Sequence, residues 1–552
     1  MTAQQLGEGI KQKFGDKVLE MDAGTPDQIN VWIVPDSVVP VANHLYHDRG
    51  CRFVISSGTD RRERNGKFLI THFFAHDQEK LYIAVHVEVK GDDPRVDSIT
   101  PAIPAANWAE REFRDMVGVV PEGHPDPRRL VLADDWPEDF YPLRTDVPYG
   151  VKPTPCENVA APRVEPPAGS SVVPIGPYFP VLEEPAYFRL FVEGEKVVGA
   201  DYRGFYNHRG VEKLGCSVLT YNQIPFIAER ICGICGFVHS CSYCQAVERA
   251  AGIQVSDRVE YIRTIMLELE RVHSHLLWLG IAGHIIGFDT VLMQTWRMRE
   301  PLMWLTERMT GNRKTYGMNL VGGVRRDIKP EHYQDINDVL TKIETEWKAL
   351  YAAIPGDPTL MARLKDTGIL TPEEAHELAA VGPTARGSGV AIDVRVDHPY
   401  AAYDQLEVTK RVYDSCDNLA RTLVRLDETL DSINLIRQAL ADMPEGPLMA
   451  EIGEDIPAGR MGMSAVEAPR GEVFHWLLTG GENRPERWRV RAPTYANLQC
   501  VPTIITGDSV ADVPLDLGSF DPCFSCTDRM EVTDINSGII RVCRSDDLLT
   551  GS

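Results

Sequence analysis

Hydrophobic periodicity changes along the chain, from the two-residue alternation of strands to the three- and four-residue spacing of helices. The runs RFVISSG at 52–58 and KLYIAVHVEV at 80–89 predict strands, mixed with shorter helical stretches. The run FRLFVEGEKVV, which begins at Phe188, predicts a hairpin with its turn at Glu193 to Glu195. We therefore expect a small α+β region followed, beyond the hairpin, by a mainly helical one.

Two long helices are predicted in the later region. The first begins near Asp257, where Asp257 and Glu260 fit a capping box, and its buried stripe comprises Ile262, Ile265, Met266, Leu269, His273 and Leu276. The second runs from about Tyr403 to Leu440. Helices of this length pack against each other, so we expect a bundle-like core with the functional site at the helix ends.

A proline-rich, weakly periodic segment separates the region of short strands and helices from the mainly helical region. It runs from Val147 to Ser171 and has the composition of an interdomain linker. The predicted fold class is α+β, with a small N-terminal α+β domain linked to a larger, mainly helical domain. The predicted domain ranges are 1–146, the linker 147–171 and a second domain that begins at residue 172.

Composition and charge limit the classes of partner. The 552 residues are 43% hydrophobic, which is enough for two or more sizeable cores, and the formal charge of -23 argues against nucleic acid and anionic lipid as ligands. The N-terminus has no apolar core after a basic start, so we expect no secretory signal. The apolar run from His275 to Phe288 is too short for a membrane span and predicts a buried helix.

Four of the twelve cysteines lie close together, at Cys232, Cys235, Cys241 and Cys244. Their C-x2-C-x5-C-x2-C spacing is compatible with a structural zinc site or an iron–sulfur cluster. Glycines 233 and 236 allow the backbone of the first pair to bend around an ion, whereas the second pair lies on a helix predicted to begin near His239. We interpret Cys241 and Cys244 as buried apolar thiols, with a local redox role as the alternative.

A third C-x-x-C pair, Cys523 and Cys526, follows Asp521-Pro522 near the end of the chain. The distance along the chain excludes a ribbon-type zinc finger but allows a site assembled by the fold. The combination of R-x-C-G-x-C-x-x-x-H with D-P-C-x-x-C resembles the large subunit of [NiFe] hydrogenases, and the matching residues are Arg230, Cys232, Gly233, Cys235, His239, Asp521, Pro522, Cys523 and Cys526.

Further segments narrow this resemblance to the membrane-associated, energy-converting group of formate hydrogenlyase type. They are NHRGVEKL, ERVHSHLLWLG, NLVGGVRRD, EAPRGEVFHW, RAPTYANLQ and DPCFSCTDRM, and the resemblance runs from about Ile175 to Met530. The first domain resembles the C-type subunit of NADH:quinone oxidoreductase through residues 110–147, and the second is related to the D-type subunit of that complex. Through its relation to NADH:quinone oxidoreductase, the family is also associated with quinone binding and NAD binding.

The resemblance implies reversible formation and oxidation of hydrogen at a nickel–iron centre whose iron carries carbon monoxide and cyanide. Cys232 and Cys523 would be terminal nickel ligands, while Cys235 and Cys526 would bridge to iron. Cys523 and Glu184 are the candidate proton acceptors. Arg470 would lie over the iron ligands and favour their charged states.

The resemblance assigns the remaining candidates to the surroundings of the metals. Thr494 would reach a cyanide, although a turn hydroxyl that satisfies backbone is an equal alternative. Asp521 is expected to pair with Arg470, although an Asp-Pro pair also simply starts a turn. His239 is expected to hydrogen-bond a bridging sulfur unless it is an ordinary core histidine. Glu212 matches a carboxylate near a possible magnesium or other second metal, although a charged residue in a turn is usually only solvated.

The family also implies partners. They are an iron–sulfur small subunit, further iron–sulfur electron-transfer subunits, integral membrane subunits, and maturation proteins with an endopeptidase. The endopeptidase would cleave after Arg529 and release Met530 to Ser552, so the resemblance implies a second domain of residues 172–529 and a C-terminal extension of residues 530–552. The implied location is cytoplasmic, peripheral on the inner face of the cytoplasmic membrane through partner subunits. The alternatives are a metal-free quinone-site subunit of a complex I relative and a zinc-stabilised scaffold.

Overall fold

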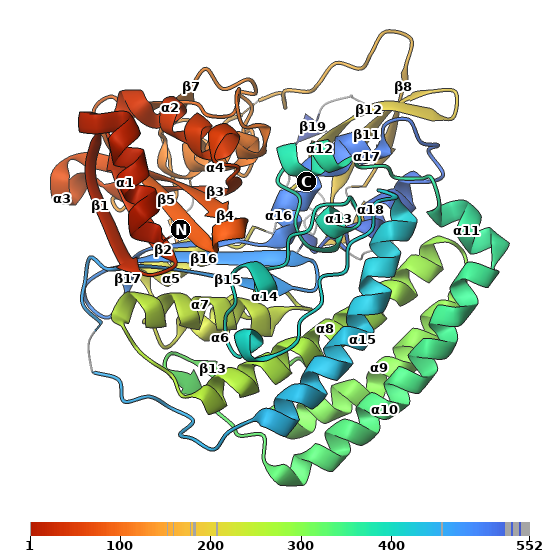
Figure 1. Cartoon of the computed structure of the whole chain (residues 1–552). Coiled ribbons are helices and arrows are strands. Elements are labelled where there is room, and N and C mark those ends of the chain that lie inside the picture. The colour runs from red at the N-terminus through yellow and green to blue at the C-terminus, as the bar shows by residue number, and fades with distance from the viewer. Residues whose placement is uncertain are drawn as a thin grey trace. The chain divides into compact units, whose positions relative to one another are not determined.

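A computed structural model describes residues 2–524 except 152, 158, 177, 180–183, 206–207 and 454–455, together with two short strands, β18 (Val532–Thr533) and β19 (Ile540–Arg541). The chain forms two compact units. The first comprises Met1–Glu193, Val198–Lys213 and the residues from Phe524 onward, and the second comprises Gly194–Val197 and Leu214–Cys523. Helices and strands are both abundant, as expected for an α+β chain (Figure 1).

The first unit contains a five-stranded sheet in the order β1-β2-β5-β4-β3. Its strands are β1 (Val18–Thr25), β2 (Gln28–Ile33), β3 (Arg52–Arg61), β4 (Lys67–His76) and β5 (Leu81–Lys90). Neighbouring strands are antiparallel except β2 and β5, which are parallel. The two predicted runs lie in β3 and β5, so this part of the prediction is confirmed.

Two helices of the first unit pack on this sheet closely enough to require glycine. A Cβ on Gly58 of β3 would lie 2.6 Å from Cγ2 of Val117, at the end of α4 (Asn107–Val117). A Cβ on Gly7 of α1 (Ala3–Phe14) would lie 2.3 Å from Cδ1 of Ile29 in β2. Contact at these distances leaves room for no side chain, so both glycines set the helix-to-sheet spacing.

The predicted hairpin is also confirmed. Strands β11 (Tyr187–Glu193) and β12 (Lys196–Arg203) flank Gly194 and Glu195, and β8 (Ser171–Ile175) pairs with β11. The described residues between 147 and 170 form neither helix nor strand. Because the first compact unit continues past this segment to residue 193, the role of 147–171 as a domain boundary stays a prediction.

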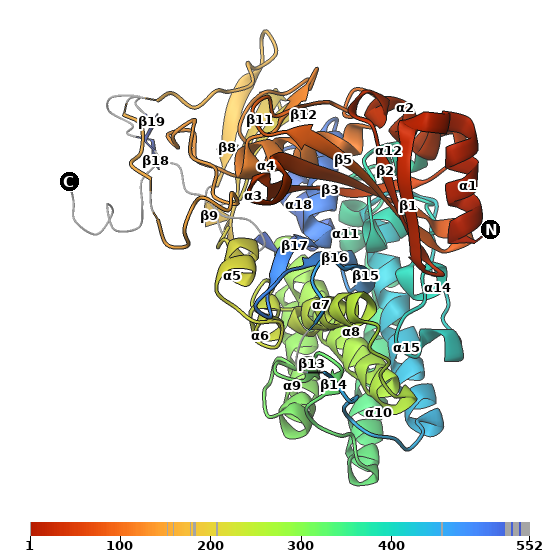
Figure 2. The ribbon, with the colours of Figure 1, turned by 90° about the vertical axis from the view of Figure 1, so that its left-hand side faces the viewer.

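Long helices dominate the second unit. They are α7 (Gly236–Ala251), α8 (Asp257–Ile285), α9 (Asp289–Thr310), α10 (Pro330–Ala353) and α15 (Asn418–Asp442). Figure 2 and Figure 1 both show α7 between α8 and an antiparallel sheet of β15 (Met461–Ala468), β16 (Gly471–Thr479) and β17 (Pro485–Arg491). This arrangement encloses α7, which follows the first cysteine pair, within the core.

The predicted helix starts need correction. Ser256, not Asp257, caps α8, since its Oγ accepts a hydrogen bond from Val259 N at 3.3 Å. The start near Tyr403 is wrong, because residues 403–405 form one 3-10 turn and α15 begins only at Asn418, after the cap residue Asp417. Cys416, with a φ of 62°, interrupts any helical path before that cap. Helix α7 begins at Gly236, three residues before the predicted start.

Most of the apolar run from His275 to Phe288 belongs to α8, where Leu276, Trp278 and Leu279 are buried, so a core helix is confirmed for that part. The run's last three residues lie beyond the end of α8 at Ile285, and Phe288 is exposed. Within the described part of the chain, we find no helix that combines the length and the apolar character needed to cross a membrane.

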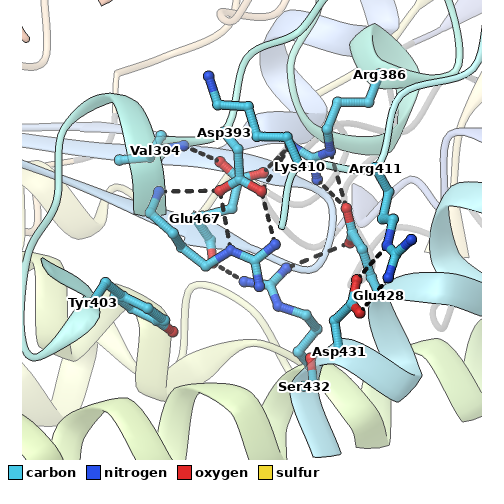
Figure 3. Close-up of polar contacts among 12 residues, drawn as sticks. Arg386, Asp393, Val394, Tyr403, Lys410, Arg411, Glu428, Asp431, Ser432 and Glu467 are labelled. Atoms are coloured by element: carbon cyan, nitrogen blue, oxygen red, sulfur yellow. Dashed lines mark hydrogen bonds and ion pairs between the residues drawn. The ribbon is translucent and has the colours of Figure 1, made fainter. Parts of the chain in front are cut away.

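A network of ion pairs whose central members are fully buried cross-links this core (Figure 3). Arg386, at the end of α13 (Gly382–Arg386), donates to Glu428 of α15 (Nε to Oε1, 2.9 Å) and to Glu467 of β15 (Nη1 to Oε1, 2.8 Å). Arg395 of α14 (Val394–Asp397) donates to both carboxylate oxygens of Asp393, at 2.7 and 3.0 Å. The network therefore attaches the bundle to β15, whose continuation carries Arg470.

Candidate metal centre

The fold brings the first and third cysteine pairs together. Cys232 lies in the loop between α6 (Ile224–Ala228) and α7, Cys235 occupies the residue before α7, and Cys523 follows α18 (Val513–Ser519). Cys232 Sγ lies 3.0 Å from Cys235 Sγ and 3.2 Å from Cys523 Sγ, and all three side chains are buried and unbridged. Cys526 lies outside the described residues. Three of the four predicted ligands thus meet at one place.

These thiols have the chemistry of a partial ligand set. Backbone N–H groups of Ile234 and Cys235 donate to Cys232 Sγ at 3.4 and 3.3 Å. Hydrogen bonds from the thiols of Cys235 and Cys523 lower the pKa of Cys232 well below its usual value, while the contact with Cys232 and burial raise the pKa of Cys235. One thiolate forms readily and further ones require a compensating cation, which suits a soft, late transition metal.

The described residues do not enclose a complete metal site. In the part of the chain that the structure describes, no group of three or more His, Cys, Asp and Glu side chains forms a ready-made cation site. Cys526, the second cysteine of D-P-C-x-x-C and the predicted fourth ligand, is not among those residues.

The guanidinium of Arg470 is the positive charge that the sequence predicts beside the thiols. It lies between β15 and β16, is 2% exposed, and donates from Nε to Asp521 O at 2.5 Å and from Nη2 to Asp521 Oδ1 at 2.6 Å. Its Nη1 also donates to Ser274 Oγ of α8 at 3.2 Å. The predicted pairing of Arg470 with Asp521 is present. Asp521 holds the guanidinium edge formed by Nε and Nη2, while Ser274 holds Nη1.

Asp521 and Arg425 keep hydrogen-bonding capacity that the described residues do not use. Asp521 Oδ2 and the Nε and Nη2 of Arg425, on α15, have no hydrogen-bond partner among those residues, although both side chains are buried. Burial raises the pKa of Asp521 to about 6, and the charges of Arg470 and Arg425 oppose that rise. Unpaired polar atoms this deep are costly unless a bound group satisfies them.

Asp521 also has a strained backbone. Its φ of 57° lies in the left-handed region, and it precedes Pro522. Strain of this kind persists where the surrounding structure enforces it and is frequent at functional sites. Here it lies two residues before Cys523.

Thr494 holds the backbone of Cys523. It lies on α16 (Pro493–Asn497), and its Oγ1 accepts a hydrogen bond from Cys523 N at 3.1 Å. This is the backbone-satisfying role that was the alternative to cyanide binding, and it keeps Cys523 at a fixed place beside Cys232. Contact with a cyanide stays a prediction.

His239 lies inside α7, beside His475 of β16. Trp488 Nε1 donates to His475 Nδ1 at 3.2 Å, so a neutral His475 carries its proton on Nε2 and donates it to His239 Nδ1, 3.1 Å away. Burial lowers the pKa of His475 well below its usual value, in agreement with the neutral form. The remaining proton of a neutral His239 is then on Nε2, the tautomer that a hydrogen bond to a sulfur requires.

The other candidates lie elsewhere. Glu212 is half-buried in α5 (Val211–Ser217), and Glu184 lies in β10 (Glu184–Pro185), with its side chain outside the described residues. The predicted cleavage position after Arg529 is outside them as well. Cys241 and Cys244 are buried in α7, where burial raises the pKa of Cys241 to about 12 and that of Cys244 well above its usual value. This confirms their interpretation as buried thiols.

Ser274 and Arg425 were missed by the sequence reasoning. Arg421, Arg425 and Glu428 recur at four- and three-residue spacing within the long helix, a pattern that also fits a solvated charged face. Only their burial shows that these charges point inward.

Comparisons with known proteins show which families this chain resembles. A family model of the respiratory-chain NADH dehydrogenase 30 Kd subunit matches residues 31–152, one of the 49 Kd subunit matches 286–460 and 452–529, and one of nickel-dependent hydrogenases matches 209–288. The nickel-dependent match covers the Cys232–Cys235 loop.

Two curated relatives from Escherichia coli K12 match almost end to end. Formate hydrogenlyase subunit 5 is 42% identical over 97% of this chain and 95% of its own length, and hydrogenase-4 component G is 40% identical over 95% and 92%. A chain in the solved structure of the membrane-bound sulfane sulfur reductase, an archaeal respiratory membrane complex, is 29% identical with a TM-score of 0.62, covering 66% of this chain and 99% of that one. The protein therefore belongs to the formate hydrogenlyase type of membrane-associated [NiFe] hydrogenase large subunits, which are oxidoreductases that act on hydrogen and are related to complex I.

Proposed function

We propose that this chain is the catalytic subunit of a membrane-associated hydrogenase complex and that Cys232, Cys235, Cys523 and Cys526 hold its nickel–iron centre. The observation that carries the proposal is the meeting of thiols from two distant C-x-x-C motifs within 3.2 Å of Cys232 Sγ, beside a buried arginine. A structural zinc site also takes four thiolates. The unused polar atoms of Asp521 and Arg425 favour instead a metal that carries small polar ligands.

In this proposal Cys232 and Cys523 would hold the nickel, and Cys235 and Cys526 would hold both the nickel and an iron that would carry carbon monoxide and cyanide. When bound, the centre would supply an open metal position for heterolytic formation or cleavage of hydrogen. The chain's own task is to hold a proton nearby, at Cys523 Sγ or at the Glu184 carboxylate. Burial of the cysteines limits competition from water.

The surrounding residues orient and balance this centre. Arg470, kept in place by Asp521, supplies a fixed positive charge for ligands of the iron, and Thr494 fixes the backbone of Cys523 and is proposed to reach a cyanide. His239 in the tautomer derived above would donate to a bridging sulfur. We assign Glu212 to a second metal such as magnesium.

Electrons would leave through an iron–sulfur small subunit and further iron–sulfur subunits, because the sequence contains no separate cluster motif of its own. Integral membrane subunits would hold the complex at the cytoplasmic face of the membrane. Maturation proteins would insert the metals, and an endopeptidase would cleave after Arg529. The names of the relatives, a formate hydrogenlyase subunit and a hydrogenase-4 component, support assembly into such a complex.

The test is infrared spectroscopy combined with metal analysis of the complex purified from its own host. We expect bands of metal-bound carbon monoxide and cyanide together with one nickel per chain, and loss of both in Cys523→Ser. Fully processed complex that contains zinc, or no metal, and shows no such bands would overturn the proposal. Such a result would lead back to a quinone-site subunit or a scaffold.

A further inference from the structure

A short segment with no assigned role lies along the first cysteine pair. We call residues 314–317, between α9 and β13 (Asn319–Leu320), the strap. Thr315 within it is fully buried and has a φ of 63°, which a β-branched residue rarely adopts. A conformation this costly, roughly 1–3 kcal/mol, persists only where surrounding contacts enforce it.

Two buried glutamates hold Thr315 and Gly317 of the strap. Thr315 Oγ1 donates to Glu270 Oε1 at 3.0 Å, and Gly317 N donates to Glu229 Oε1 and Oε2 at 2.8 and 3.0 Å. Both glutamates are fully buried. Glu229 lies three residues before Cys232, so the strap is attached directly to the start of the metal-binding loop.

The centre of the strap contacts the loop itself. Tyr316 donates from its hydroxyl to the carbonyl oxygen of Cys232 at 3.0 Å, and the Arg230 guanidinium lies 4.9 Å from the centre of its ring. A Cβ on Gly236 would lie 2.2 Å from Tyr316 Cε1. The glycine of C-G-F is therefore needed for this close approach of the tyrosine ring, and not only for bending around an ion.

Glu270 connects the strap to α7, the helix that begins directly after Cys235. The side chain of Cys235, the residue before α7, makes no capping hydrogen bond to the N-terminus of that helix. Instead Glu270, from α8, accepts hydrogen bonds from Phe237 N (Oε1, 3.0 Å) and Val238 N (Oε2, 3.0 Å). Burial raises the pKa of Glu270 to about 8, and the three donors to its carboxylate oppose that rise. One carboxyl group thus satisfies the helix end and Thr315 of the strap together.

We propose that Tyr316 and Glu270 are positioning residues for the metal centre, which hold Cys232 and Cys235 in ligand geometry before and after the metals bind. The inference rests on the proposed function. Tyr316 fixes the peptide of Cys232, and Glu270 fixes the helix end behind Cys235. The strap thereby supports one side of the ligand set, as Thr494 supports Cys523. Hydrogen-bond partners of this kind typically change metal affinity by about 10- to 100-fold.

The experiment uses the intact complex and two minimal changes. Tyr316→Phe removes only the hydroxyl, and Glu270→Gln keeps the shape of the side chain but places an amide N–H₂ where a backbone donor must be accepted. Glu260→Gln, the same change in the first turn of α8, is the matched control. For each we would measure nickel per chain, the rate of nickel release to a chelator, and the positions of the carbon monoxide and cyanide bands.

We expect Tyr316→Phe and Glu270→Gln to release nickel roughly 10-fold faster than wild type and to shift the infrared bands, while Glu260→Gln does neither. In a second pair, Thr315→Val should behave like Glu270→Gln, and Thr315→Ser, which keeps the hydroxyl, should behave like wild type. Variants that retain wild-type bands and nickel release would overturn the inference. Absence of nickel and bands from the wild-type complex would instead overturn the proposed function.

Discussion

Replacing Arg386 with methionine is expected to destabilise the second unit strongly, because it removes the central cation of the buried network. Methionine keeps most of the aliphatic volume of the side chain, so the change is mainly electrostatic. Arg386 is 0% exposed and donates to Glu428, to Glu467 and, at 2.7 Å, to the carbonyl of Ile392. Without it, Glu428 keeps His275 at 3.2 Å and Glu467 keeps Val394 N at 3.2 Å.

The magnitude follows from the burial of both carboxylates. Removing one partner of a fully buried pair costs about 3–5 kcal/mol, because the other charge stays desolvated. Burial already raises the pKa of Glu467 to about 7, with the charge of Arg386 opposing the rise. Loss of Arg386 raises that pKa further. The variant's deficit should therefore be smaller below pH 7, where Glu467 can be protonated, and larger above it.

The assay is urea unfolding of the metal-free chain, followed by tryptophan fluorescence at several pH values. Arg313→Met is the control, since Arg313 pairs with Glu300 on the surface with side chains 47% and 60% exposed, and such pairs contribute at most about 1 kcal/mol. Adding Glu467→Gln to Arg386→Met should recover part of the loss. Equal unfolding midpoints for Arg386→Met and Arg313→Met, or a deficit that grows as pH falls, would refute the reasoning.

Three further changes test the candidate site. Gly236→Ala should lower the nickel content, and should lower the free energy of unfolding by about 1–3 kcal/mol, because its Cβ would lie 2.2 Å from Tyr316 Cε1 and 2.6 Å from Glu229 O. Gly233→Ala should be tolerated, because no atom lies within 4 Å of its Cβ. Equal effects of the two changes on metal content and melting temperature would contradict this. Thr494→Val leaves the buried Cys523 N–H without its acceptor, at a cost of about 1–3 kcal/mol, and should speed nickel release to a chelator. Thr494→Ser keeps the hydroxyl and should match wild type. Valine and serine variants with the same rate of nickel release would count against the contact. Iodoacetamide followed by mass spectrometry at neutral pH should label exposed Cys156 and leave Cys241 and Cys244 unmodified in the folded protein, and their labelling ahead of Cys156 would show that they are not buried thiols.

Local patterns were sufficient for the regular elements. The strands at 52–61 and 81–90, the hairpin around Gly194 and the long helix from residue 257 all follow from periodicity and turn residues, which act between neighbours in sequence. The start of α15 was misplaced because residues 406–417 contain apolar and charged side chains at helix-like spacing. Their actual path depends on Asp417 as a cap and on contacts with distant segments.

The motifs also predicted the chemistry of the site, although not the residues that hold the cysteines in place. The cysteine pairs, Arg470 and Asp521 carry a recognisable pattern in the sequence, and the fold brings Cys232, Cys235 and Cys523 together with the Arg470–Asp521 pair beside them. Glu229, Glu270 and Tyr316 have no such pattern. A glutamate in a helix usually faces solvent, so nothing local indicates that Glu270 points inward to the end of another helix.

By itself, the sequence determined which side chains can act as soft metal ligands, which segments form strands or helices, and the family to which the chain belongs. These depend on residue type and short-range spacing. Only the tertiary structure decided that Arg386, Glu428 and Glu467 are buried together, and that Thr494 and Tyr316 hold the backbones of the two cysteine segments. Those contacts join residues far apart in sequence, and their energies come from burial and from paired hydrogen-bonding groups, which exist only once the chain has folded.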